Sequence, residues 1–305
     1  MSILNTTICD NNGANTGFGD CAIDPKLPQF IIRVPKSFEL TEANMVDSAT
    51  VMAKLDAATK ADLFADRIFP YPQQVLVTDN STDTTYQTLG AGFNVPVNEG
   101  MYDWTLQFIK GGKCLNDKLR AFNKSDNDYF FVVDADGRLF GRKVGTSLKG
   151  IPANYIFTDK LKIATDATIT VYAYRVNFLP NYFNENGGSI PLDLGELQEL
   201  SGLNNIIPSL VAPRATTTFG FRATTGCGGI NLYDQYSTQL ADPALYEFIR
   251  SGTSIVISSV TAVPSTKSFT VVLASSGAGT FGGSTVTLLD AAGVVGFEIQ
   301  DIYVA

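Results

Sequence analysis

The chain contains no histidine in its 305 residues. Histidine is the commonest general base in enzymes and a common neutral metal ligand. Its absence therefore excludes Ser-His-Asp and Cys-His centres together with histidine-ligated zinc. Carboxylate-based glycosidases and lysine bases are not excluded by this observation.

Charged residues are also scarce. They make up 17% of the chain, against a typical share of about 25%. One explanation is surface buried in an assembly, where charge is depleted at the core of the interface. Extracellular and low-complexity proteins can have a similarly low share of charge. The formal net charge is −8, which argues against a nucleic-acid-binding protein because such proteins neutralise phosphates with basic patches. An acidic surface does suit a conduit along which DNA moves without sticking.

Cysteines are few, and long apolar runs are missing. Of the four cysteines, none forms a C-x-x-C pair, so a zinc site is not expected. Cys9 and Cys21 flank a segment rich in Gly and Asn and could form a disulfide or remain free thiols; we expect free thiols, because a core of this size needs no cross-link. No stretch approaches the ~20 apolar residues of a membrane span, and no basic start precedes an apolar run. We expect synthesis in the cytoplasm without a membrane partner.

The remaining pattern is mainly β, with one or two short helices. Trp104, Leu106 and Phe108 alternate with polar residues, as does the segment 169–179, and this period of two is typical of strands. Two apolar runs flank Asp136-Gly137, a dipeptide that favours a β-hairpin. Helical spacing predicts a helix over 48–65, with Ser48 as a possible N-cap, and another over 113–123.

We expect three parts along the chain. Residues 1–29 read as an extended N-terminal arm, and residues 30–185 as a β-sandwich or barrel that assembles. A loop with Gly187, Gly188 and Pro191 marks the boundary. Residues 186–305 then read as an Ig-like β-sandwich, because short strands recur between turns. These strands are expected at 216–223, 230–233, 254–263, 268–274, 285–289 and 294–304, with a helical turn at 244–249.

A glycine motif and an aspartate pair each permit a functional reading. The segment from Gly277 to Gly282 fits G-x-G-x-x-G, but a dinucleotide site needs a helix next and residues 284–289 look strand-like. We therefore expect a strand connection and no cofactor. Asp134 and Asp136 could belong to a calcium loop, yet the third oxygen ligand and the glutamate at position twelve are missing. A hairpin tip explains both aspartates and Gly137 without a metal.

A carbohydrate site is a further alternative. Glu196 and Glu199 lie on one turn of an expected helix, and paired carboxylates with aromatic residues are found in glycosidases. The aromatic candidates are Trp104, Tyr172, Tyr174, Tyr182 and Tyr233. Because Trp104, Tyr172 and Tyr174 lie in alternating strands, sheet packing is the ordinary role for them. We predict no catalytic residue and no enzyme activity.

The polar stretch 79–88 lies between two expected strands, and we regard it as a stronger candidate for a functional segment than the motifs above. It is rich in Thr, Asp and Ser and could be an ordinary solvated loop. In an assembling protein such loops contact neighbouring subunits. We therefore predict assembly contacts at Asp79, Asp83, Thr84 and Tyr86, and at the hairpin formed by Asp134, Asp136 and Gly137.

Residues 30–179 resemble tail-tube proteins of tailed bacteriophages. The likeness lies in the order of parts: a leading arm, a strand pair with a long polar loop, a short helix, an Asp-Gly hairpin and a closing strand. The segments that carry it are Trp104-Thr-Leu-Gln-Phe108, Gly111-Gly-Lys-Cys114, Val132-Val-Asp-Ala-Asp-Gly137 and Val171-Tyr-Ala-Tyr-Arg-Val176.

This resemblance implies a virion protein made in the cytoplasm of a host bacterium. Its subunits would form hexameric rings that stack into a hollow tube, contact other virion proteins, and let DNA pass without specific binding. The residues after Glu185 exceed a minimal tube subunit and would form an Ig-like decoration. The alternatives are a capsid or neck decoration, or an adhesin module that binds another virion protein or a surface glycan.

Overall fold

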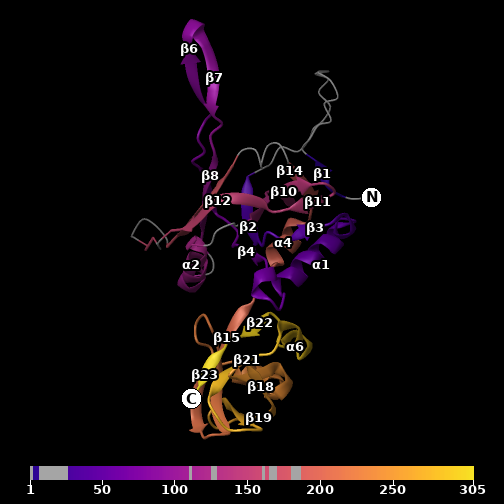
Figure 1. The fold of residues 1–305 in the computed structure, drawn as a ribbon, viewed down its shortest axis with the longest axis vertical. Coiled ribbons are helices and arrows are strands. Elements are labelled where there is room, and N and C mark those ends of the chain that lie inside the picture. Colours follow the sequence, from indigo (N-terminus) through magenta and orange to yellow (C-terminus); the bar gives the residue numbers. More distant parts are fainter. Residues whose placement is uncertain are drawn as a thin grey trace. The chain divides into compact units, whose positions relative to one another are not determined.

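The computed structural model describes residues 3–6, 27–109, 112–124, 129–159, 162–164, 170–179 and 187–305. The chain divides into two compact units. Unit 1 comprises residues 1–59 and 65–201, and unit 2 comprises residues 60–64 and 202–305. Both are mainly β with short helices, as Figure 1 shows, which confirms the predicted fold class.

Unit 1 is built on a 12-stranded sheet that forms a half-barrel. The main path of neighbouring strands is β1 (Asn5–Thr6), β14 (Gly187–Pro191), β10 (Arg138–Val144), β9 (Tyr129–Asp134), β12 (Ile151–Thr158), β13 (Tyr172–Phe178), β8 (Tyr102–Phe108) and β5 (Leu76–Asp79). The others are β2 (Pro28–Val34), paired with β9 and β4 (Phe69–Pro70), and β11 (Ser147–Lys149), paired with β10 and β3 (Glu39–Leu40). The predicted hairpin is confirmed as β9–β10.

The centre of this sheet is buried on both faces. In β9, Phe131 and Val133 pack into one apolar cluster, whereas Phe130 and Val132 pack into the other. A strand covered on both faces reads as a continuous apolar run, which accounts for Tyr129-Phe-Phe-Val-Val133. In β8 and β13 it is the alternating apolar residues that pack into one of these clusters, Leu106 and Phe108 from β8 and Tyr172, Tyr174, Val176 and Phe178 from β13, and this matches the predicted alternation.

Three α-helices belong to unit 1 among its described residues: α1 (Ser48–Thr59), α2 (Gly112–Ala121) and α4 (Leu194–Glu199). The predicted helix over 113–123 is confirmed by α2. The helix predicted over 48–65 ends at Thr59 instead, and Leu63 and Phe64 are exposed outside it. Asp47, rather than Ser48, caps α1 by accepting a 2.7 Å hydrogen bond from the Thr50 amide. This hydrogen bond lowers the pKa of the Asp47 carboxyl.

The division between the units falls at residues 201 and 202, not near 185. Strand β14 pairs with β10 over five residues. Ile190, Leu192 and Leu197 are buried in the same cluster as α1. The segment that follows the Gly/Asn-rich loop therefore completes unit 1, because its apolar side chains have their cover there.

Unit 2 is a sandwich of two sheets. One sheet has the order β19 (Ile257–Val263), β20 (Ser268–Leu273), β16 (Thr218–Thr225), β15 (Asn204–Arg214) and β22 (Phe297–Ile299). The other has the order β18 (Thr253–Ile255), β17 (Tyr246–Arg250), β21 (Gly279–Gly283) and β23 (Ile302–Val304). Phe221, Phe269 and Phe281 are fully buried in its core, so the predicted β-sandwich is confirmed.

Some predicted strands of unit 2 are helical or absent. Residues 285–289 belong largely to α6 (Val286–Ala291), whose N-cap Thr285 accepts from the Leu288 amide. The expected strand over 230–233 is a single bridge at Asn231 followed by α5 (Tyr233–Tyr236). The helical turn expected at 244–249 is the 3-10 turn Pro243–Leu245, and β17 follows it.

The cysteines that the structure describes are not free thiols. Cys114 in α2 and Cys227 after β16 are both disulfide-bonded, and none of the cysteines in the described residues is free. Cys9 and Cys21, like most of the predicted N-terminal arm, lie outside the described residues. Within the described ranges, no helix has the length and apolar character that crossing a membrane requires.

Candidate functional site

The stretch predicted as a polar loop is the outgoing limb of a long β-hairpin. Among the described strands, β6 (Thr85–Leu89) pairs only with β7 (Phe93–Asn98), and the three-residue turn Gly90–Gly92 joins them. Gly92 has a φ of +81°, as the third residue of such a turn requires. In Figure 1 this ribbon, which we call the arm (residues 85–98), extends away from the sheet that carries β5 and β8.

One face of the arm is mainly apolar. Because side chains alternate along a strand, Phe93, Val95 and Val97 share a face of β7. The register places Leu89 opposite Phe93 on that same face, together with one polar residue, Gln87, opposite Val95. Phe93 is 70% exposed and Val97 63% exposed. Every residue of β6 and β7 is exposed, so no other described part of the chain covers this face.

The opposite face of the arm is polar. It carries Thr88 and Asn94, which form a cross-strand hydrogen bond of 2.7 Å. Tyr86 lies on this face opposite Pro96. The arm is therefore amphipathic, and it contains no charged residue.

Between the arm and the sheet lies a short irregular segment, which we call the neck (residues 80–84 and 99–101). Thr82 and Met101 exchange hydrogen bonds of 3.1 Å, from the Thr82 amide to the Met101 carbonyl and from the Met101 amide to the Thr82 hydroxyl. Gly100, with a φ of +79°, lies so close to Thr82 that a Cβ would approach its carbonyl oxygen to 2.0 Å. Only glycine fits there without moving the limbs apart.

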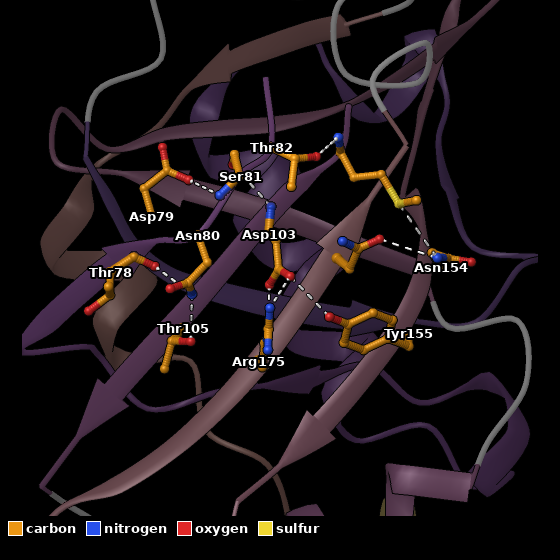
Figure 2. Close-up of polar contacts among 12 residues, drawn as sticks. Thr78, Asp79, Asn80, Ser81, Thr82, Asp103, Thr105, Asn154, Tyr155 and Arg175 are labelled. Atoms are coloured by element: carbon orange, nitrogen blue, oxygen red, sulfur yellow. Dashed lines mark hydrogen bonds and ion pairs between the residues drawn. The ribbon is translucent and has the colours of Figure 1, made fainter. Parts of the chain in front are cut away.

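A polar cluster on the outer face of the sheet lies at the foot of the neck (Figure 2). The Asp103 carboxylate accepts from Nε of Arg175 at 2.7 Å and from its Nη2. It also accepts from the Tyr155 hydroxyl at 3.1 Å. The hydrogen bond to Asp103 raises the pKa of the Arg175 guanidinium. Partial burial, followed by the bond to Asp103, raises the pKa of the Tyr155 hydroxyl.

Three of the predicted assembly residues lie in the arm and neck, and a fourth, Asp79, directly precedes the neck. Asp79 ends β5, and its carboxylate accepts from the Ser81 amide at 2.9 Å. Asp83 and Thr84 lie in the neck, where the Thr84 hydroxyl donates to the Glu99 carbonyl at 3.3 Å. Tyr86 lies on the polar face of the arm. The apolar residues of β7 were not predicted, although their alternation after Gly90-Ala-Gly92 is a hairpin signal.

The other three predicted residues form a different hairpin turn, separated from β5 by several strands. Asp134 is fully buried and accepts from the Asp136 and Arg138 amides, both at 2.9 Å. Gly137 has a φ of +76°, and a Cβ there would lie 2.5 Å from the Leu192 carbonyl oxygen. Two of the three thus shape the turn, while Asp136 is exposed. The fold does not bring this turn together with the arm.

The carboxylates of the carbohydrate alternative line a hollow to which none of its described aromatic candidates contributes. Glu196 and Glu199 line a shallow hollow of about 360 Å³ together with Asp56 of α1. No aromatic side chain from the described residues lines it. Trp104 and Tyr174 pack in the other core cluster of unit 1, and Tyr233 lies in unit 2. Tyr182 falls outside the described residues.

The glycine motif is part of the unit 2 sandwich. Its residues form β21, which pairs antiparallel with β17 and β23. A Cβ on Gly279 would lie 2.5 Å from the Phe248 ring, so glycine permits close strand packing there. The helix α6 does follow, contrary to the prediction. Its first amides donate to the Asp62 carboxylate, with Val286 at 2.8 Å.

The chain matches no protein-family model and no curated protein sequence. Its function is therefore inferred from the residues and their geometry. In the described ranges, no three metal-ligating side chains converge on one point.

Proposed function

We propose that this protein is a self-assembling structural subunit whose arm packs against a second copy of the chain. The observation that carries the proposal is the uncovered apolar face made by Leu89, Phe93, Val95 and Val97. A two-stranded hairpin alone is marginally stable in water. Burying such side chains contributes on the order of 1.5–3 kcal/mol each, so a contact across this face would stabilise both the arm and the assembly.

The contact is expected to use the face of the arm rather than its edge. Pro96 in β7 has no amide hydrogen and cannot donate to an added strand. An edge interrupted in this way resists strand addition. The lack of charge from residue 84 to 98 favours an apolar contact, because no ionic group has to lose its water.

Within this class, we propose a bacteriophage virion protein and in particular a tail-tube subunit. Support comes from the resemblance of residues 30–179, the low charged fraction and the net charge of −8. In tail-tube proteins the subunits form hexameric rings. The arm would join such rings into a stacked conduit with an acidic lumen. DNA would then pass without adhering, since like charges repel.

Sedimentation velocity over a concentration series tests the self-assembly directly. The variant Phe93→Thr with Val95→Thr makes the apolar face polar and keeps strand-forming residues. Its matched control exchanges the paired residues of the opposite face, Thr88→Asn with Asn94→Thr. We expect the control to assemble like the wild type and the first variant to sediment as a discrete small species. Equal assembly of all three proteins would contradict the proposal.

A second candidate is a decoration or adhesin module that binds another virion protein or a glycan. It is favoured by unit 2, which has its own core and exposes Ile249 and Tyr303 on one face of its smaller sheet. Both residues are aligned with Thr280 of the strand between them. This candidate predicts a discrete monomer or trimer that never stacks.

A further inference from the structure

We infer that Asp103 is the positioning residue of the arm: it fixes the direction in which the arm leaves unit 1. This inference goes beyond the proposed function, and only its consequence for assembly rests on that proposal. It is carried by the junction at which the hydrogen bonds of one residue of β8 reach the outgoing limb of the neck and two neighbouring strands, β12 and β13.

The side chain of Asp103 connects neighbouring strands. Asp103 lies at the start of β8, Arg175 lies on β13 and Tyr155 on β12. Arg175 contacts both carboxylate oxygens, and such a bidentate pair restricts orientation as well as adding energy. Asp103 is only 7% exposed, and removing a partner of a buried ion pair leaves the other charge without compensation.

The backbone of Asp103 holds the outgoing limb. Its carbonyl accepts from the Asn80 amide at 2.7 Å, and its amide donates to the Ser81 hydroxyl at 3.1 Å. The Asn80 side chain also donates to the Thr105 hydroxyl at 2.9 Å. Figure 2 shows these contacts on the same face as Arg175 and Tyr155. In the chain, Asp103 follows closely after the returning limb. These hydrogen bonds therefore tie the outgoing limb to the returning limb.

The neck beyond this junction is not a regular ladder. Neither 80–84 nor 99–101 is assigned to a strand, and pairing resumes at Thr85 opposite Asn98. The sheet and the arm are thus two regular ribbons joined by a few hydrogen bonds. A joint of this kind changes direction with small backbone rotations unless one end is clamped. The contacts of Asp103 provide that clamp.

Distance measurements between two spin labels test the inference. Nitroxide-bearing unnatural amino acids at position 90, where a Cβ would meet open space, and at exposed position 135 report the arm relative to unit 1. Labelled protein is diluted with unlabelled protein so that only distances within one chain are read. We expect a narrow distribution in the wild type and a broad one in Asp103→Asn.

Arg175→Gln provides a second variant that leaves every backbone bond of the neck in place. We expect it to broaden the distribution as well, with amide exchange in residues 80–84 faster by about tenfold, the factor for losing one charge-assisted hydrogen bond. The matched control is Lys149→Gln, which removes a 2.9 Å ion pair with Glu39 elsewhere in unit 1. It should change neither readout.

Two outcomes separate this inference from the proposed function. Narrow distributions in folded Asp103→Asn and Arg175→Gln proteins would overturn the positioning role. Broad distance distributions in both variants would support the positioning role. If the wild-type protein stayed monomeric at the same time, self-assembly would be contradicted.

Discussion

At the scale of single residues, buried tyrosines connect stability to pH. Tyr246 in unit 2 donates a 2.7 Å hydrogen bond to the Leu240 carbonyl, and Tyr174 in unit 1 accepts one from Gln74. Burial is the largest cause that raises the pKa of both hydroxyls well above the ordinary value. Each folded unit therefore favours the neutral tyrosine.

We predict that both units lose stability as the pH rises above about 10, the pKa of tyrosine in an unfolded chain. Above this value the unfolded state releases the proton while the folded state retains it, so each pH unit favours unfolding by up to about 1.4 kcal/mol per tyrosine. Below it, this contribution is fully present. Thermal unfolding from pH 8 to 11 measures the loss.

Tyr246→Phe is the matched variant. It should lower the stability of unit 2 at pH 8 by about 1 kcal/mol, because the hydrogen bond to Leu240 is lost. Its stability should then fall less steeply than that of the wild type in the alkaline range. If the stability of the variant and that of the wild type fell with pH at the same rate, Tyr246 would not be the cause of the alkaline loss.

A second prediction concerns the β9–β10 turn. Asp134→Ala leaves the amides of Asp136 and Arg138 without the carboxylate that accepts from them, and should destabilise unit 1 by about 1–3 kcal/mol. Asp134→Asn keeps an accepting oxygen and should cost less. Chemical denaturation of both variants measures the difference; equal losses would contradict the role of the carboxylate in the turn.

At the scale of elements, strands were predicted well where one face is buried. The alternation of Trp104, Leu106 and Phe108 predicted β8, and Asp136-Gly137 predicted the β9–β10 hairpin. The segment Val286-Thr-Leu-Leu289 was predicted as a strand because β-branched residues favour strands. The Thr285 cap and the Asp62 carboxylate, supplied from 224 residues away, make it a helix instead. Such long-range contacts are not visible in a local pattern.

We predict that Asp62 stabilises unit 2 although it lies between two elements of unit 1 in the sequence. Asp62→Ala removes the acceptor of the Val286 and Thr287 amides and should lower the stability of unit 2 by about 1 kcal/mol, as for a lost helix cap. Asp62→Asn retains a capping oxygen and serves as control. Calorimetry should show a shift in the transition of unit 2 but not of unit 1. An unshifted transition of unit 2 would contradict this role.

The candidate site was only partly predictable. The polar composition of residues 79–88 singled out the segment that runs from the end of β5 through the neck into β6. Assembly contacts at its residues Asp79, Asp83, Thr84 and Tyr86 stay a prediction. The apolar face of β7 was missed, because apolar residues in a strand are ordinarily interpreted as core. Whether such residues meet a core or solvent depends on the fold, which the local sequence does not specify.

At the scale of the whole molecule, the proposed function is assembly. An amphipathic arm whose strands are exposed, few charges and an acidic balance agree with a subunit that buries surface against copies of itself. The division at residue 202 also assigns β14 and α4 to the unit that carries the arm. Unit 2 would then be added to an assembling body that is complete without it.

Negative-stain electron microscopy of the purified protein over a concentration series is the decisive test of self-assembly. We expect rings of uniform diameter, or hollow tubes that lengthen with concentration, and neither for the variant Phe93→Thr with Val95→Thr. Discrete monomers or trimers of the wild type at every concentration would contradict the proposed function.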